Sequence, residues 1–137
     1  MLKKILVALD GSENAEKSLP WGIRLARLLK SKIVFLHVYP AGPAGLRGQH
    51  RENLDALNKR MMRVCGKLQE QGRRAAFNVQ RGDAADRILA FADRNDLILA
   101  TTHGFGGFMR WVFGSVAEKL IHDAPIPVLV YKTAGQA

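Results

Sequence analysis

The chain has little of what disulfide-rich, metal-binding or membrane-spanning proteins depend on. It contains a single cysteine, Cys65, so no disulfide forms within the chain, and this usage favours a reducing compartment such as the cytoplasm. Its 4 histidines are spread over separate segments without the spacing of a metal site. Its apolar runs are far shorter than the roughly 20 residues needed to cross a bilayer. We therefore expect a cytoplasmic protein with no resident metal and no membrane partner.

The charge is strongly one-sided, with 21 Lys and Arg against 12 Asp and Glu and a net charge of +9. Such an excess attracts anions, nucleic acid among them. The basic residues between Arg47 and Arg81 are scattered among apolar ones, however, and residues 47–76 hold no aromatic side chain on which bases could stack. The pattern therefore favours a solvated helix face over a nucleic-acid surface.

Two hydrophobic periodicities alternate along the chain. Short apolar or alternating runs predict strands at 3–9, 33–39, 75–80, 97–100 and 128–131. Apolar residues spaced by three and four predict helices at 14–30, 51–71, from 84 onward after Gly82-Asp83, and at 115–122. Alternation of this kind is typical of an α/β domain with an open, doubly wound parallel sheet of five strands and helices on both faces. The 137 residues fit one such domain, 1–137.

The segment from Thr101 to Ser115 carries the clearest functional signal. Glycines at 104, 106 and 107 follow a predicted strand, and Gly114-Ser115 stands where a new helical pattern begins. Glycine lets backbone N–H groups approach a ligand closely, and a helix start favours an anion. A strand, a glycine loop and a helix start together indicate a phosphate cradle, with a loop that merely turns the chain as the alternative. The segment is neither a Walker-type P-loop nor a Rossmann fingerprint.

Asp10 follows the first predicted strand, as Thr101 follows the fourth. Ligands of open α/β sheets bind outside the carboxyl ends of the strands, where the strand order reverses, so the two residues would face one crevice if their strands are neighbours. A carboxylate at Asp10 is suited to accept hydrogen bonds from a ribose or to hold a cation near phosphates. The alternative is that Asp10 caps the following turn. No serine is paired with a visible base and acid, so no catalytic residue is assigned.

The sequence resembles the universal stress protein family over essentially its whole length. The resemblance is carried by K-K-I-L-V-A-L-D-G-S at 3–12, Gly82-Asp83, D-L-I-L at 96–99, G-S-V-A-E-K-L at 114–120 and P-I-P-V-L-V at 125–130. It implies the strand order 3-2-1-4-5 and a role in stress response through a protein partner that the sequence does not identify. It also implies a homodimer formed through the last strand, at Val128, Leu129 and Val130.

The ATP-binding branch of that family carries G-x-x-G, nine residues, and then Gly-Ser or Gly-Thr. Gly104 and Gly114-Ser115 fit this spacing, while Thr101 takes the place of the first glycine. The resemblance implies that Asp10 meets the ribose, that Val38 presents backbone to adenine, and that Gly104, Gly114 and Ser115 hold the phosphates. The full set implied to bind ATP, ADP or AMP, with Asp10 able to meet a nucleotide-bound magnesium, is Ala8, Asp10, Val38, Thr101, His103, Gly104, Gly107, Gly114, Ser115 and Val116.

Two other interpretations of the same sequence stay open. Thr101 favours a ligand-free interaction module of the same family, since it departs from the nucleotide-binding motif. A slow ATPase is the third, with Asp10 as the nearest candidate base.

Overall fold

One parallel sheet organises the computed structural model, which describes residues 2–11, 13–42, 48–101 and 115–132. Its strands are β1 (Lys4–Leu9), β2 (Lys32–Tyr39), β3 (Ala75–Arg81), β4 (Asp96–Thr101) and β5 (Val128–Tyr131). They lie in the order β3-β2-β1-β4-β5, and each neighbouring pair is parallel. The predicted sheet and the strand order 3-2-1-4-5 are therefore confirmed.

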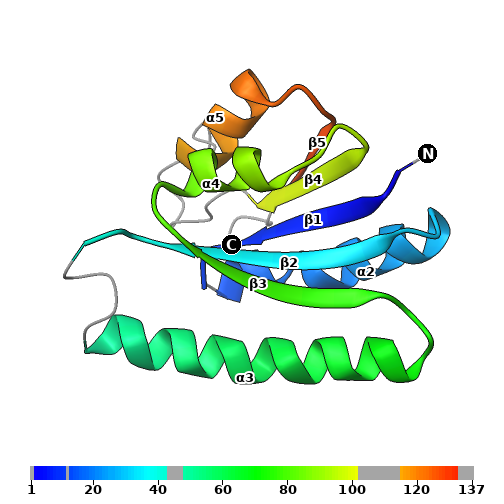
Figure 1. The fold of residues 1–137 in the computed structure, drawn as a ribbon, viewed down its shortest axis with the longest axis horizontal. Coiled ribbons are helices and arrows are strands. Elements are labelled where there is room, and N and C mark those ends of the chain that lie inside the picture. Colours follow the sequence, from blue (N-terminus) through cyan, green and yellow to red (C-terminus); the bar gives the residue numbers. More distant parts are fainter. Residues whose placement is uncertain (1, 12, 43–47, 102–114, 133–137) are drawn as a thin grey trace.

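Helices cover both faces of this sheet. They are α1 (Glu13–Glu16), α2 (Leu19–Leu28), α3 (Gln49–Glu70), α4 (Ala84–Phe91) and α5 (Ser115–Asp123). Figure 1 shows α2 and α3 on one face and α4 and α5 on the other. This arrangement follows from right-handed crossovers between parallel strands.

The single helix predicted at 14–30 is wrong, because the structure divides it into α1 and α2. Pro20 lies in the first turn of α2, where its missing N–H group would have had no helical partner. Ser18 fills the break: its hydroxyl donates to the carbonyl oxygen of Ala15 at 2.6 Å, and the residue is fully buried.

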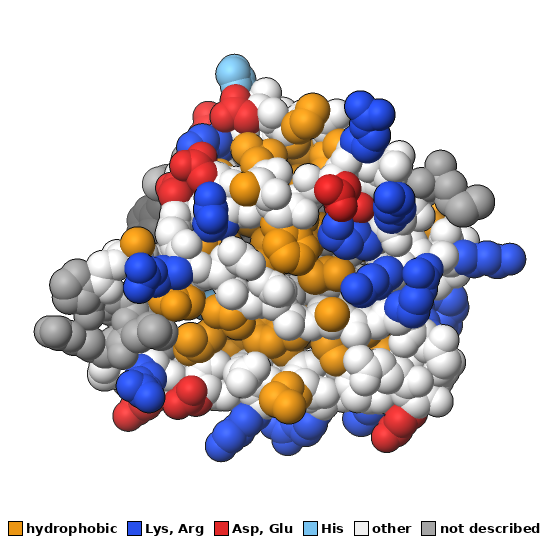
Figure 2. Space-filling view, in the orientation of Figure 1, with side chains coloured by type: hydrophobic (Ala, Val, Ile, Leu, Met, Phe, Trp, Pro, Cys, Tyr) orange, Lys and Arg blue, Asp and Glu red, His pale blue; other side chains and the backbone are white. Residues whose placement is uncertain are grey.

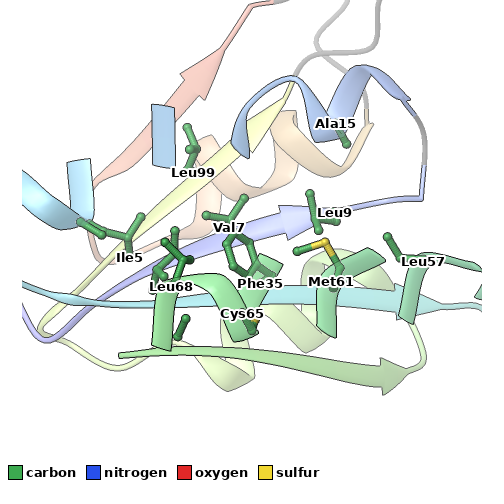
Figure 3. Close-up of a cluster of buried hydrophobic side chains, with 13 residues drawn as sticks. Ile5, Val7, Leu9, Ala15, Phe35, Leu57, Met61, Cys65, Leu68 and Leu99 are labelled. Atoms are coloured by element: carbon green, nitrogen blue, oxygen red, sulfur yellow. The ribbon is translucent and has the colours of Figure 1, made fainter. Parts of the chain in front are cut away.

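The strands alternate between two hydrophobic clusters, one on each face of the sheet. Ile5, Val7 and Phe35 pack with α3 residues such as Met61 in the first cluster, which Figure 3 shows. Residues one step along the strands belong to the second cluster, against α4 and α5. Cys65 lies in the first cluster, 6% exposed, and burial raises the pKa of its thiol.

Candidate functional site

A pocket of about 70 Å³ lies at the carboxyl ends of the central strands. Ala8 and Asp10 reach it from the end of β1, Val38 from β2, and Thr101 from the last position of β4. Val116 closes it from the first turn of α5. These five predicted ligand residues therefore line one pocket, although they come from four separate segments of the chain.

The topology explains why Asp10 and Thr101 meet. Strands β1 and β4 are neighbours, paired from Lys4 with Asp96 to Val7 with Leu99. The chain runs outward from β1 through β2 to β3 and then returns to place β4 on the other side of β1. The strand order reverses at this point, where open α/β sheets form a crevice.

Of the remaining predicted ligand residues, the structure describes only Ser115. His103, Gly104, Gly107 and Gly114 lie outside the described residues. Ser115 is the first residue of α5 and is exposed. Its position at a helix start is as the sequence predicted, whereas its contact with a phosphate remains a prediction.

Thr101 occupies its position in the motif in an ordinary backbone conformation. Among the described residues, Lys30 is the only one other than glycine with a positive φ. Thr101 therefore does not adopt the left-handed conformation that glycine favours. Its Oγ1 atom is buried and has no hydrogen-bond partner within the described part of the chain. A buried hydroxyl left unpaired costs about 1–3 kcal/mol, so any group that bonds it gains by that amount.

The sequence did not identify the other residues of the pocket wall. They are Leu9, Ala15, Ala84, Ile88, Ala100 and Ala117. Most of them are alanines, whose short side chains leave space beside the strand ends. A signal for two of them was present, because Ala84 and Ile88 are four residues apart and share one face of α4.

Polar contacts tie together the two helices that cover the pocket. The Asp83 carboxylate caps α4 by accepting the N–H of Asp86 at 3.0 Å. Lys119 of α5 reaches back to α4, with its Nζ atom 2.8 Å from Asp86 Oδ1 and 3.7 Å from Asp83 Oδ2. The hydrogen bond from Lys119 lowers the pKa of Asp86, and the same bond raises the pKa of Lys119.

The described residues also bear on metal binding and on membrane insertion. Within the ranges that the structure describes, no group of three or more His, Cys, Asp or Glu side chains is placed to hold a metal ion. None of the described helices is both long and apolar enough to span a bilayer.

Known proteins match the sequence along nearly all of its length. The profile of the universal stress protein family matches residues 1–132. A universal stress protein of Methanocaldococcus jannaschii is 30% identical over 145 residues, which cover 96% of this chain and 83% of the relative. One of Thermus aquaticus is 30% identical over 141 residues, which cover 96% of this chain and all of the relative.

Solved structures match the fold. A universal stress protein of Lactobacillus plantarum superposes with a TM-score of 0.73 at 21% identity, over 93% of this chain and 96% of its own. One of Archaeoglobus fulgidus in complex with dAMP has a TM-score of 0.66 at 21% identity, with coverage of 95% and 97%. A family protein of Arabidopsis thaliana with AMP bound has a TM-score of 0.69 at 20% identity, with coverage of 96% and 92%. Because the family profile spans residues 1–132 and the sheet has the strand order that the resemblance implied, the chain belongs to the universal stress protein family.

Proposed function

We propose that this protein binds an adenine nucleotide, with ATP as the first choice, and acts as a regulatory protein in stress response rather than as an enzyme. The observation that carries the proposal is that Asp10, Val38 and Thr101 line one pocket at the reversal of strand order. Relatives of the same fold with dAMP or AMP bound support adenine as the base.

In this proposal the pocket holds the base and ribose. The apolar side chains of Ile88 and Val116 form a wall for adenine, the backbone of Val38 faces its edge, and the Asp10 carboxylate accepts hydrogen bonds from the ribose hydroxyls. The phosphates are assigned to His103, Gly104, Gly107, Gly114 and Ser115, as the family motif implies, and Asp10 is assigned to a magnesium that they carry.

The proposed regulatory unit is a cytoplasmic homodimer. Strand β5 lies at an edge of the sheet, and Leu129 on it is 44% exposed. An exposed edge strand offers unpaired backbone groups to a second chain. Pairing of two copies along Val128, Leu129 and Val130 would satisfy those groups and cover the leucine.

Isothermal titration calorimetry with ATP, ADP and AMP, with and without magnesium, tests the nucleotide proposal. We expect binding by the natural protein and a loss of about tenfold or more in Asp10→Ala, because a hydrogen bond to a charged group contributes about 1.5–3 kcal/mol. Asp55→Ala is the matched control, since it removes an exposed carboxylate on α3, away from the pocket. Failure of the folded protein to bind at millimolar concentrations would overturn the proposal.

Thr101 separates nucleotide binding from the ligand-free alternative. If the module is naturally ligand-free, Thr101→Gly creates binding that the natural chain lacks. If the Thr101 hydroxyl serves the ligand, Thr101→Val weakens binding without lowering stability, because it removes a hydroxyl that has no partner among the described residues. Steady ADP release that depends on Asp10 would instead favour the slow ATPase.

A further inference from the structure

The Asp10 pocket lies at the carboxyl ends of the strands. Their amino ends, at the opposite end of the sheet, carry a row of cations. Arg94 precedes β4, Lys3 precedes β1, Lys30 precedes β2 and Arg74 precedes β3. These four strands are neighbours in the sheet, in the order β4-β1-β2-β3, so a basic residue comes shortly before each of them. Figure 2 shows Lys and Arg side chains gathered at this end of the molecule, on the right.

Backbone hydrogen bonds fix the spacing of this cationic row. The N–H of Lys3 donates to the carbonyl oxygen of Asn95 at 2.7 Å, and the N–H of Lys32 donates to that of Lys3 at 3.2 Å. The N–H of Ile33 donates to the carbonyl oxygen of Arg74 at 3.0 Å. With neighbouring strands about 4.8 Å apart, the row spans roughly 14 Å across the amino ends of the four strands.

The cations of the row are available to a partner. Lys3, Lys30, Arg74 and Arg94 are exposed, and none of them forms an ion pair within the described residues. Lys4 differs from them, since its ammonium is paired with the buried carboxylate of Asp96. Like charges held side by side produce a local potential that attracts an anion, and the exposed Asp93 carboxylate, 3.5 Å from Lys4 Nζ, lies at the β4 end of the row.

A second pocket adjoins the row at its β4 end. It has a volume of about 360 Å³ and is lined by Leu89, Ala92, Asp93, Arg94, Pro125 and Ile126. Arg94 belongs to both features, because it lines this pocket and heads the row. Four of the six lining residues, Leu89, Ala92, Pro125 and Ile126, are apolar and Asp93 and Arg94 are charged, so an apolar side chain can pack against one part of the pocket.

We propose that the amino ends of the strands, with the adjoining pocket, dock an acidic protein segment that carries a large apolar residue. The apolar side chain enters the pocket at Leu89 and Ile126, and the carboxylates that follow it along the segment meet Arg94, Lys3, Lys30 and Arg74. In protein interfaces a buried anchor residue usually supplies most of the affinity, and charged residues around it orient the partner.

Three features of this edge favour a polypeptide over a phosphate-bearing surface. The four cations precede neighbouring strands in the order of the sheet, and this serial arrangement fits a chain better than a plane of lipid headgroups. The pocket is concave, whereas a bilayer surface is flat. Asp93 on the pocket rim is 70% exposed and pairs with Lys4 Nζ at 3.5 Å, and a polypeptide can place an uncharged residue beside this pair.

The first experiment measures fluorescence anisotropy of a labelled peptide made of one phenylalanine followed by a run of glutamates. We expect Lys3→Glu/Arg74→Glu to weaken binding about tenfold, because it replaces two exposed attractions with two repulsions. Arg51→Glu/Lys59→Glu on α3 is the matched control, since it changes net charge equally at exposed sites away from the row. If the first variant does not fold, Lys30→Glu/Arg94→Glu replaces it.

The second experiment tests the pocket with a peptide in which alanine replaces the phenylalanine. This peptide is expected to bind about tenfold more weakly or worse, since a buried phenylalanine side chain contributes about 1.5–3 kcal/mol. Ala92→Trp fills the pocket and should weaken only the phenylalanine peptide. Equal affinities for the two peptides, or equal weakening by the α3 control, would overturn the proposal. So would tighter binding of duplex DNA or phosphatidylserine vesicles with the same dependence on Lys3 and Arg74.

Discussion

His37 Nδ1 lies 2.9 Å from the carbonyl oxygen of Leu9, and the two residues face each other across the β1–β2 pairing. Since the carbonyl can only accept, the ring nitrogen donates, and Nδ1 carries the proton. The ring is 8% exposed and lies beneath Gly11, where an added Cβ would be 3.6 Å from its Cε1 atom. His37 therefore supports, from the opposite face of the sheet, the turn that places Asp10 in the pocket.

We expect His37→Phe to lower nucleotide affinity by about three- to tenfold, because the lost hydrogen bond is worth about 0.5–1.5 kcal/mol in holding the turn. The phenylalanine ring keeps most of the packing, so the midpoint of thermal unfolding should fall only by the few degrees that the lost hydrogen bond accounts for. Calorimetric titration with ATP beside a thermal melt measures both quantities.

His37→Asn is the control for that change. Its side-chain amide can present an N–H group near the position of Nδ1, so binding should partly recover. Equal affinity in the phenylalanine variant and the natural protein would show that the Leu9 contact does not position Asp10.

Gly22 in α2 gives a test of core packing. A Cβ added there would lie 3.0 Å from Val7 Cγ2 and 3.3 Å from Leu99 Cδ2, both buried in the sheet. We expect Gly22→Ala to lower the free energy of unfolding by about 1–3 kcal/mol through overpacking. Gly66→Ala in α3 meets nothing within 4 Å and should raise stability by about 0.5–1 kcal/mol through helix propensity. Urea unfolding of both variants decides the matter, and a stable Gly22→Ala protein would contradict the close fit.

The fold could be predicted from the sequence where one periodicity holds along a segment. The buried run at 4–9 and the regular spacing of apolar residues in 49–70 each specify one structure. The break between α1 and α2 has one local signal, Pro20, although Ala15 and Leu19 continue the helical spacing across it. The burial of Ser18, which completes the break, is a tertiary feature that a local pattern does not contain.

The site could be predicted in part. Asp10 and Thr101 stand at strand ends, and that position alone brings them together once β1 and β4 are neighbours. Ala15 and Ala117 were missed because a small residue on a helix has the same pattern whether it packs tightly or leaves room for a ligand. The cationic row was missed for a different reason: its members lie far apart in the sequence and become neighbours only through strand order.

The pair formed by Lys4 and Asp96 gives a prediction for stability. Asp96 is fully buried and accepts hydrogen bonds from Lys4 Nζ and, at 2.6 Å, from the N–H of Asp93. We expect Lys4→Met to destabilise the protein by about 3–5 kcal/mol, because it leaves a carboxylate buried without its counter-charge. The double change Lys4→Met/Asp96→Leu should recover part of that loss. Urea unfolding of the natural protein, the single variants Lys4→Met and Asp96→Leu and the double variant measures the coupling, and additive losses would show that the pair is not coupled.

The contact between Lys119 and Asp86 makes stability depend on pH in a defined direction. The pKa of Asp86 is lowered by the hydrogen bond from Lys119, so its contribution is present above the unfolded pKa of about 3.9 and is lost as pH falls through the folded value. The pKa of Lys119 is raised by Asp86, so its contribution is present below about pH 10.4 and is lost as pH rises through the folded value.

We expect Lys119→Met to return the pKa of Asp86 towards its ordinary range, as followed by carboxyl-carbon NMR titration. The stability difference from the natural protein should be flat from about pH 5 to 9 and should shrink in acid. The effect on stability will be small, since the two side chains are 44% and 59% exposed and solvent screens the pair. Lys59→Met is the control, because it removes an exposed ammonium from α3 without touching α4 or α5. An unchanged Asp86 titration in Lys119→Met would mean that the ion pair does not hold α5 against α4, and that packing around Ile88 and Leu120 keeps the pocket covered instead.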